Sequence, residues 1–300
     1  MTTDTSVAES TPGFDRALII GCGLIGGSLG HGLVHHRVCG RVIGYDANAA
    51  NADKALSRGL LDEVATSLDA AIASVDLVIL AVPVGRTADL VKHLARGALA
   101  HSIIVDSGSV KQAFAQQCAQ SMPEALRKRV IPCHPIAGHV TAGPEHADRA
   151  LMAGRPMIMT PSPDTDPGAL ERVGQMWKRI GFDILTMSVQ EHDAMYADLS
   201  HMPHVIAFTL MKHIRERGMR PDILKMFAGN AFKDMTHHAG QNPRMWRDIF
   251  HTNRQEICRS LAGFRKSLDE LERVINSDDQ DRLERVLTQL QEARLHTWQS

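Results

Sequence analysis

Between residues 16 and 187, short apolar runs alternate with segments of helical period. The runs are continuously apolar, which is typical of strands covered on both faces. The segments between the first four runs suit helices; in Thr87–Leu99, apolar residues recur at positions 88, 91, 94, 95 and 98. Repeated strand–helix–strand units predict a parallel, doubly wound α/β sheet. The predicted strands are Ala17–Cys22, Val42–Tyr45, Leu77–Val82, Ile103–Val105, Val130–Cys133, Met157–Met159 and Asp183–Met187.

The strand pattern stops near residue 188, and the rest of the chain has the pattern of helices. Residues 191–217 are rich in Met, Leu and Ile. Further on, apolar residues recur every three or four positions, a narrow seam that packs one helix against another. The pattern leaves open whether this seam lies in the core of one chain or in a dimer contact. The seam consists of Ile257, Leu261, Phe264, Leu268, Leu271 and Ile275, and a second, shorter one of Leu283, Leu287 and Leu290.

A glycine-rich turn directly follows the first predicted strand. The run from Gly21 to Gly26 reads G-x-G-x-x-G and opens a helical segment, the context in which this motif binds a dinucleotide. Gly21 permits a tight turn, Gly23 lets the backbone approach a pyrophosphate, and Gly26 lets helix and strand pack closely. At Leu24 and Ile25, the start of the helix offers free N–H groups and a partial positive charge to the phosphates.

The second predicted strand ends at Asp46, 20 residues after the last glycine of the motif. A carboxylate at this position accepts hydrogen bonds from ribose hydroxyls and repels a 2′-phosphate, and no basic residue follows before Lys54. NAD is therefore favoured over NADP. Val82, Pro83 and Ser107 follow the next two strands, so we expect them beside the nicotinamide at the carboxyl edge of the sheet.

These patterns predict an α/β, Rossmann-like, doubly wound parallel sheet followed by an all-helical domain. We place the NAD-binding domain at residues 15–187 and the helical domain, for substrate binding and dimerisation, at residues 188–300. A chain of 300 residues suits two domains. Residues 1–14 are polar and rich in Ser and Thr, and we expect them to form a disordered tail.

Composition excludes several classes of protein. Lys and Arg number 33 and Asp and Glu 34, with no basic stripe, which argues against a nucleic-acid binder. We expect neither a signal peptide nor a membrane span, because no apolar stretch reaches about 18 residues. The five cysteines are scattered and form no C-x-x-C pair. This favours reduced thiols in a cytoplasmic protein over a disulfide scaffold or a zinc site.

Chemistry-bearing residues follow several predicted strands and break one helix. Ser109 lies after the fourth strand and His134 after the fifth, while His201 and His204 interrupt a helical segment. In this order, behind the glycine motif, these residues resemble the prephenate dehydrogenase family, including its arogenate and cyclohexadienyl variants. The resemblance runs from residue 16 to the C-terminal helices. Its motifs are Gly108-Ser109-Val110-Lys111, His134-Pro135-Ile136-Ala137-Gly138, Ser200-His201-Met202-Pro203-His204, Phe232-Lys233-Asp234-Met235-Thr236 and the segment 242–250.

The resemblance implies an NAD-dependent oxidative decarboxylation of prephenate or arogenate, a step of tyrosine biosynthesis. The hydride leaves ring C4 for NAD, a base takes the hydroxyl proton, and loss of carbon dioxide aromatises the ring. His134 is the implied base, because imidazole acts as a base near neutral pH. Ser109 is the implied catalytic partner, which either hydrogen-bonds the same substrate hydroxyl or orients the ring, and His204 is an implied substrate-binding histidine. A metal site of His201, His204 and His237 has no supporting carboxylate or cysteine, so we expect no metal.

The sequence departs from the family pattern at two places. The family arginine that binds a substrate carboxylate is replaced by His237, and the family Thr-Glu pair by His139-Val140. Another cation then has to bind the carboxylate, or the substrate differs, 4-amino-4-deoxyprephenate being the alternative with the same chemistry. Candidate substrate-binding residues besides His204 and His237 are Lys233, His238, Arg244 and Arg247.

Two other classes of protein stay open as alternatives. A Rossmann-fold sensor would bind NAD without catalysis. A 3-hydroxyisobutyrate-type dehydrogenase would have a catalytic lysine on a long interdomain helix, which the sequence does not show at a convincing place. For the favoured enzyme, the expected partners are a small cyclohexadienyl carboxylate and a second copy of the chain, joined through the helical domain.

Overall fold

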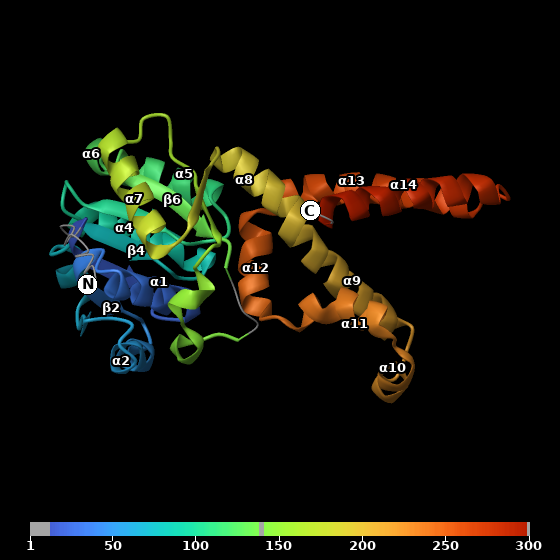
Figure 1. Ribbon diagram of the computed structural model, residues 1–300, viewed down its shortest axis with the longest axis horizontal. Helices are drawn as coiled ribbons and strands as arrows, with labels where there is room; N and C mark the ends of the chain where they lie inside the picture. Colours follow the sequence, from blue (N-terminus) through green and yellow to red (C-terminus); the bar gives the residue numbers. More distant parts are fainter. Residues whose placement is uncertain (1–12, 138–140, 299–300) are drawn as a thin grey trace, which may run out of the picture.

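The computed structural model describes residues 13–137 and 141–298. Within them, eight strands form one sheet in the order β3-β2-β1-β4-β5-β6-β7-β8 (Figure 1). The order reverses between β1 and β4, the switch point at which a doubly wound sheet binds its ligand. The fold class predicted from sequence is thus confirmed. The strands are β1 (Phe14–Ile20), β2 (Cys39–Tyr45), β3 (Glu63–Val64), β4 (Leu77–Leu80), β5 (Ile103–Asp106), β6 (Val130–Pro135), β7 (Pro156–Met159) and β8 (Asp183–Thr186).

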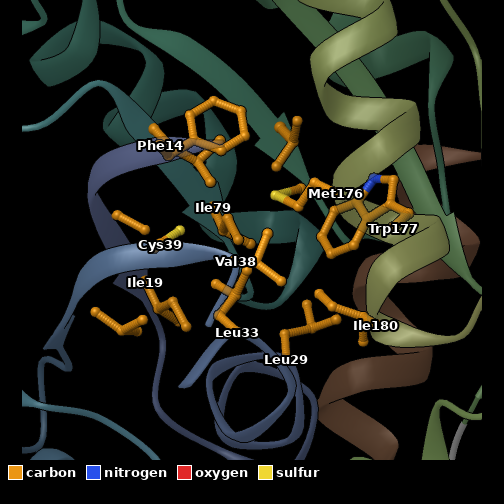
Figure 2. Close-up of a cluster of buried hydrophobic side chains, with 14 of the residues drawn as sticks. Phe14, Ile19, Leu29, Leu33, Val38, Cys39, Ile79, Met176, Trp177 and Ile180 are labelled. Carbon is orange, nitrogen blue, oxygen red and sulfur yellow. The ribbon is translucent and has the colours of Figure 1, made fainter. Parts of the chain in front are cut away.

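Helices cover both faces of this sheet, which explains why the strands are continuously apolar. In β1, Ile19 faces a cluster with Leu29 and Trp177, while the adjacent Leu18 faces a second cluster with Val91 and Phe114. Figure 2 shows the first cluster between the sheet and helices α1 and α7. The helices of this half are α1 (Leu24–His35), α2 (Ala49–Ser57), α3 (Leu68–Ile72), α4 (Thr87–Gly97), α5 (Gln112–Ser121), α6 (Glu124–Arg127) and α7 (Pro167–Ile180), with 3-10 turns η1 (Val84–Arg86), η2 (Pro144–His146) and η3 (Arg149–Leu151).

One strand pair departs from the parallel arrangement. Strand β7 runs antiparallel to β6, with His134 opposite Ile158, and β8 runs parallel to β7. The described part of the β6–β7 connection contains only the short turns η2 and η3. A parallel pair needs a crossover, usually an α-helix, to carry the chain back to the opposite edge of the sheet. Without such a helix, β7 enters the sheet from the edge at which β6 ends.

The start of the sheet corrects one predicted boundary. Phe14, assigned above to the tail, belongs to β1 and is 1% exposed. The guanidinium of Arg172 lies over its ring, 4.3 Å from the centroid, and covers it. Gly13, also assigned to the tail, donates its N–H to the Val38 carbonyl at 3.0 Å, and residues 1–12 lie outside the described residues. The sequence reading also missed β3, because two residues are too few to show a pattern.

The second half of the described chain is helical. Helix α8 continues through a π-helical turn, η4, into the long helix α9 (Figure 1). Pro203, at the start of α9, cannot donate a backbone hydrogen bond, and the irregular turn lies directly before it. The elements are α8 (Val189–Tyr196), η4 (Ala197–His201), α9 (Met202–Glu216), α10 (Pro221–Phe227), α11 (Asn230–Thr236), η5 (His237–Gly240), α12 (Pro243–Thr252), α13 (Arg254–Ile275) and α14 (Gln280–Trp298).

Helices α13 and α14 form a hairpin that projects away from the sheet (Figure 1). The predicted apolar seam lies along it and is fully covered only at its beginning. Ile257 is 4% exposed, whereas Leu268 is 53% and Ile275 59% exposed. Leu261, Phe264 and Leu271 are half-buried, so part of the seam has no cover within one chain. None of the helices in the described ranges is long and apolar enough to cross a membrane.

Candidate active site

The glycine motif forms the tight turn between β1 and α1. Gly21 has φ +98°, a left-handed conformation that other residues rarely adopt, and a Cβ there would collide with the Ala81 carbonyl. A Cβ at Gly26 would collide with the Gly21 carbonyl. At Gly23, by contrast, no atom lies within 4 Å of a built Cβ, and no side chain caps the N-terminus of α1. The turn is therefore open at the place where a phosphate would meet free N–H groups.

Asp46 lies beside this turn at the end of β2. Its Oδ2 accepts a hydrogen bond from the Cys22 N–H at 2.8 Å, and its Oδ1 accepts one from the Asn48 N–H at 2.8 Å. Oδ1 also accepts a longer hydrogen bond from Asn51 Nδ2 at 3.4 Å, whereas Oδ2 keeps a lone pair for a ribose hydroxyl. The carboxylate thus also fixes the glycine turn, a structural role that sequence reasoning did not foresee.

The carboxyl ends of β4 and β5 lie next to each other, as predicted. Val82 and Pro83 follow β4, and the Ser107 N–H and hydroxyl both donate to the Leu80 carbonyl, at 2.8 and 3.1 Å. Ser109 is partly exposed just beyond, and its hydroxyl has no hydrogen-bond partner within the described residues. The loop leaves that hydroxyl free to bind a ligand.

Helix α12 packs onto the same edge of the sheet. Trp246 and Ile249 of α12 join Val110, which follows β5, in a small buried cluster. Gly85 allows the close approach, because a Cβ there would lie 2.7 Å from Asp248 Oδ2. The helical half is thereby held against the loops that carry the predicted cofactor and catalytic residues.

At the carboxyl end of β6, His134 belongs to a hydrogen-bonded chain of side chains. Its Nδ1 lies 2.8 Å from His192 Nε2, and His192 Nδ1 lies 2.7 Å from Asp193 Oδ1. Asp193 Oδ1 and Oδ2 also accept from the backbone N–H groups of Lys111 and Gln112, at 2.8 and 2.9 Å. These two N–H groups open helix α5, so the carboxylate of α8 caps a helix of the other half.

This chain determines which ring nitrogen of His134 is free to act as a base. Asp193 accepts from two backbone N–H groups, so we assign the proton between Asp193 and His192 to His192 Nδ1. His192 Nε2 then accepts, and His134 Nδ1 donates to it. The lone pair of His134 is left on Nε2. This is the arrangement of a general base oriented by a second group.

The surroundings of His134 favour its neutral form. Its partly exposed ring packs against His192 and Tyr196, with centroids 5.1 and 4.6 Å away. Desolvation lowers the pKa of His134 well below 6.5, and the nearby His192, Lys111 and His201 lower it further. Burial raises the pKa of Tyr196 to about 12, so its hydroxyl stays protonated. A neutral imidazole is the form that accepts a proton.

A second histidine cluster lies along η4 and α9. His204 stacks on Trp246 with ring centroids 3.5 Å apart, and the His238 ring lies 4.4 Å away. His204 Nδ1 donates to the Ser200 carbonyl at 2.9 Å, which leaves Nε2 as its acceptor. Buried His204 Nε2 and His238 Nδ1 have no partner in the described structure. The indole Nε1–H of Trp246 donates to Gln241 Oε1 at 2.9 Å.

Apart from His238, the residues predicted to bind a substrate carboxylate lie outside this histidine cluster. Lys233, His237 and Arg244 are exposed, and the guanidinium of Arg247 pairs with Asp248 at 2.6 and 2.8 Å. Among the described residues of η5, His238 is the imidazole that contacts His204. His139-Val140 lies outside the described residues. No group of three or more His, Cys, Asp or Glu side chains suited to a metal ion occurs in the described ranges.

The two halves of the chain match two models of one family. The model described as the prephenate dehydrogenase nucleotide-binding domain matches residues 30–186, and the prephenate dehydrogenase dimerization domain matches residues 188–289. The chain belongs to the prephenate dehydrogenase family. As a member, it is an NAD-dependent oxidoreductase of tyrosine biosynthesis, and the open glycine turn suits that cofactor.

Individual members of the prephenate dehydrogenase family are similar over most of the chain. The cyclohexadienyl dehydrogenase of Zymomonas mobilis is 33% identical over 284 residues, 94% of this chain and 96% of that protein. The prephenate dehydrogenase of Bacillus subtilis is 30% identical over 90% of this chain and 72% of its own length. The crystal structure of Aquifex aeolicus prephenate dehydrogenase with hydroxyphenyl propionate and NAD+ has a TM-score of 0.87 and 32% identity, covering 97% of this chain and 99% of that one.

Sequence reasoning did not assign several residues of this candidate site. His192 and Asp193 were passed over as part of a helix start, since Ser188 and Glu191 form a capping box just before them. Asn253, which donates to the Asp193 carbonyl at 2.9 Å and contacts His201 Nδ1 at 3.0 Å, lies far away in the sequence. The adjacent His-Asp pair was the one available signal.

Proposed function

We propose that this chain catalyses the NAD-dependent oxidative decarboxylation of prephenate, with His134 Nε2 as the base. The observation that carries the proposal is the chain from Asp193 through His192 to His134, which leaves a lone pair on a neutral imidazole beside the carboxyl edge of the sheet. The A. aeolicus relative, whose structure holds NAD+ and a hydroxyphenyl acid, supports a substrate of this shape.

In the proposed reaction, His134 Nε2 takes the proton of the C4 hydroxyl as the C4–H bond breaks. NAD, when bound, accepts that hydride. The C4–O bond becomes a carbonyl, and the C1–carboxylate bond then breaks, so that its electrons aromatise the ring and carbon dioxide leaves. The phenolate oxygen regains a proton from the His134 imidazolium. Through His192, the Asp193 carboxylate stabilises the imidazolium while it exists.

We propose that the remaining predicted residues position the ligands. Gly21, Gly23, Gly26 and the N–H groups of Leu24 and Ile25 would hold the pyrophosphate, and Asp46 the ribose. Val82, Pro83 and Ser107 would lie against the nicotinamide. The free hydroxyl of Ser109 would hydrogen-bond the reacting hydroxyl of the substrate, and His204 Nε2 would reach one of its polar groups.

Arogenate and 4-amino-4-deoxyprephenate are the competing substrates. The relatives include a Synechocystis arogenate dehydrogenase, with 27% identity and a TM-score of 0.79. Position 237, where the resemblance implies an arginine, holds an exposed histidine, so another group would have to bind the substrate carboxylate. The deciding experiment is an NADH-release assay with prephenate, arogenate and the 4-amino analogue, using wild type and His134→Asn. Release from prephenate that is lost in the variant supports the proposal; NAD binding without NADH release from any of the three acids would point to a sensor.

We infer that the functional unit is a homodimer formed through the helical half. The family model of this half is a dimerization domain, and the uncovered apolar side chains are concentrated there. Met226 and Phe227 at the end of α10 are each 74% exposed, and Leu290 of α14 is 58% exposed. Light scattering on wild type and Leu268→Glu tests this: we expect a dimer that the charge dissociates, and a monomeric wild type would refute it.

A cytoplasmic location is also part of the proposal. It rests on the cysteines, all free in the described structure and four of them buried.

A further inference from the structure

The end of β5 carries an ion pair that is closed off from solvent. The Lys111 side chain is 0% exposed and Asp106 is 1% exposed, and the ammonium donates to Asp106 Oδ2. Lysine and aspartate are almost never fully buried without a partner, because removing two charges from water costs several kcal/mol per ion. Apolar side chains of similar volume would often serve stability equally well. The pair therefore calls for a reason other than stability.

The pair binds both backbone groups of Cys133, the residue just before His134. Asp106 Oδ1 accepts from the Cys133 N–H at 3.1 Å, and Lys111 Nζ donates to the Cys133 carbonyl at 2.6 Å. Asp106 Oδ2 also accepts from the Gly108 N–H at 3.1 Å, which ties the Ser107–Ser109 loop to the same group. The position of His134 relative to that loop is thus set through one buried carboxylate and one ammonium.

Lys111 also reaches the other end of the histidine pair. Its backbone N–H donates to Asp193 Oδ1 at 2.8 Å, next to the oxygen's contact with His192. One residue therefore supports His134 through its side chain and His192 through its main chain. The histidines come from different halves of the chain, and Lys111 joins their supports.

We propose that Asp106 and Lys111 form a buried positioning pair that sets both the place and the protonation state of His134. The ammonium is a fixed positive charge near the imidazole, so it disfavours a second positive charge there. This keeps the base neutral and ready to accept a proton. The catalytic consequence of this proposal rests on the proposed function, in which His134 is the base. The electrostatic effect on His134 does not require turnover.

Other groups act on the same ring. Among the described residues, α8 contributes His192, Asp193 and Tyr196, and η4 contributes His201. Of these, Asp193 carries the opposite charge, and it is separated from His134 by His192. Lys111 lowers the pKa of His134 together with His192 and His201.

The test measures the titration of His134 by NMR in protein with labelled histidines, without substrate. The variants are Lys111→Met and the double variant Asp106→Asn/Lys111→Met, which removes both charges at similar volume. His134→Asn assigns the resonance. Lys128→Met is the matched control, because Lys128 forms an exposed pair with Glu124. We expect wild-type His134 to stay neutral below pH 6.5 with its proton on Nδ1. Lys111→Met should raise the pKa of His134, because it removes a fixed positive charge. The double variant should raise it less, because it also removes the negative charge of Asp106, and the control should leave it unchanged.

Turnover gives the second readout. In each test variant, the acidic limb of kcat/KM should move to higher pH by the same amount as the pKa that NMR measures. This movement is separate from any fall in kcat. A role in folding alone would lower thermal stability and leave the limb and the NMR titration unmoved, which would overturn the proposal. Titration of wild-type His134 at an ordinary histidine pKa would also overturn it, even if Lys111→Met does not fold. If no acid is turned over but the NMR shift appears, the proposed function fails and the positioning pair stands.

Discussion

His192 Nε2 lies 2.8 Å from His134 Nδ1, although the two residues come from different halves of the chain. The contact joins the last residues of β6 to the first turn of α8. It makes the tautomer of one imidazole depend on that of the other. The base is therefore built by two domains together.

Asp193→Asn should invert this arrangement. An amide N–H can donate to His192 Nδ1, so the His192 proton moves to Nε2 and His134 Nδ1 becomes the acceptor. His134 Nε2 then carries a proton and cannot act as the base. We expect kcat to fall by about 10²–10⁴-fold with the affinity for NAD unchanged. Steady-state kinetics and calorimetric titration of NAD check this, and an Asn variant with near-normal kcat would remove the relay from the mechanism.

The pH–rate profile follows from the neutral state of His134. Because its pKa is lowered, the base is already neutral at pH 6.5, and activity should fall only as the pH drops through that lowered pKa. His134→Asn should lower kcat by about 10²–10⁴-fold and abolish this acidic limb. The measurement is kcat/KM against pH for both proteins. A wild-type limb above pH 6.5 would contradict the lowered pKa.

Cofactor choice should depend on Asp46. A 2′-phosphate would meet a carboxylate whose oxygens already hold Cys22 and Asn48, and the preference for NAD should amount to a few kcal/mol. Asp46→Asn, which can still accept from Cys22, should narrow the ratio of kcat/KM for the two cofactors. Equal values for wild type with NAD and NADP would show that Asp46 does not select the cofactor.

The two neighbouring histidines of η5 should behave differently. His238 packs against His204 and keeps an unpartnered nitrogen, while His237 is exposed. If His238 supplies a hydrogen bond to a substrate carboxylate, His238→Ala should raise KM for prephenate about 10–150-fold, the equivalent of a charge-assisted hydrogen bond. His237→Ala should leave KM unchanged. A lower KM in His237→Arg would instead show that position 237 reaches the substrate.

Stability should decline in mild acid because buried imidazoles resist protonation. Burial lowers the pKa of His201 to about 4, from 6.5. The unfolded chain binds this proton at a higher pH than the folded one, so stability is lost as the pH falls from 6.5 towards 4. His201 alone should account for about 2 kcal/mol between about pH 7 and about pH 5. Urea unfolding at both values measures the loss, and His201→Gln should reduce it.

The sequence was sufficient for features that depend on local pattern. Gly21 forms the expected tight turn, Gly26 allows the expected close packing, and the apolar runs form buried strands. It was insufficient where distant segments meet. Nothing in the pattern around His134 points to His192, because their contact depends on where α8 leaves the sheet. The reversal at β7 was hidden for a similar reason: an apolar run carries no direction.

The neighbouring histidines 237 and 238 also show what a sequence pattern cannot predict. The resemblance implies that position 237, which holds an arginine in the family, faces the substrate; in the short turn η5, His237 is exposed and its neighbour His238 contacts His204. The geometry of this turn decides which of the two adjacent side chains points towards His204. The sequence of helix α9, which supplies His204, does not indicate which of these two histidines His204 contacts.

The cap that Asp193 places on α5 has a mechanical consequence. Two hydrogen bonds tie the first turn of α8 to the sheet half, so this turn moves with the sheet as one rigid piece. Any swing of α9 that closes the helical half over a ligand has to bend the chain after Asp193. The π-helical turn at Ala197–His201 lies just there, where the regular hydrogen-bond ladder is already interrupted. A bend at this turn would leave the hydrogen bonds among His134, His192 and Asp193 in place.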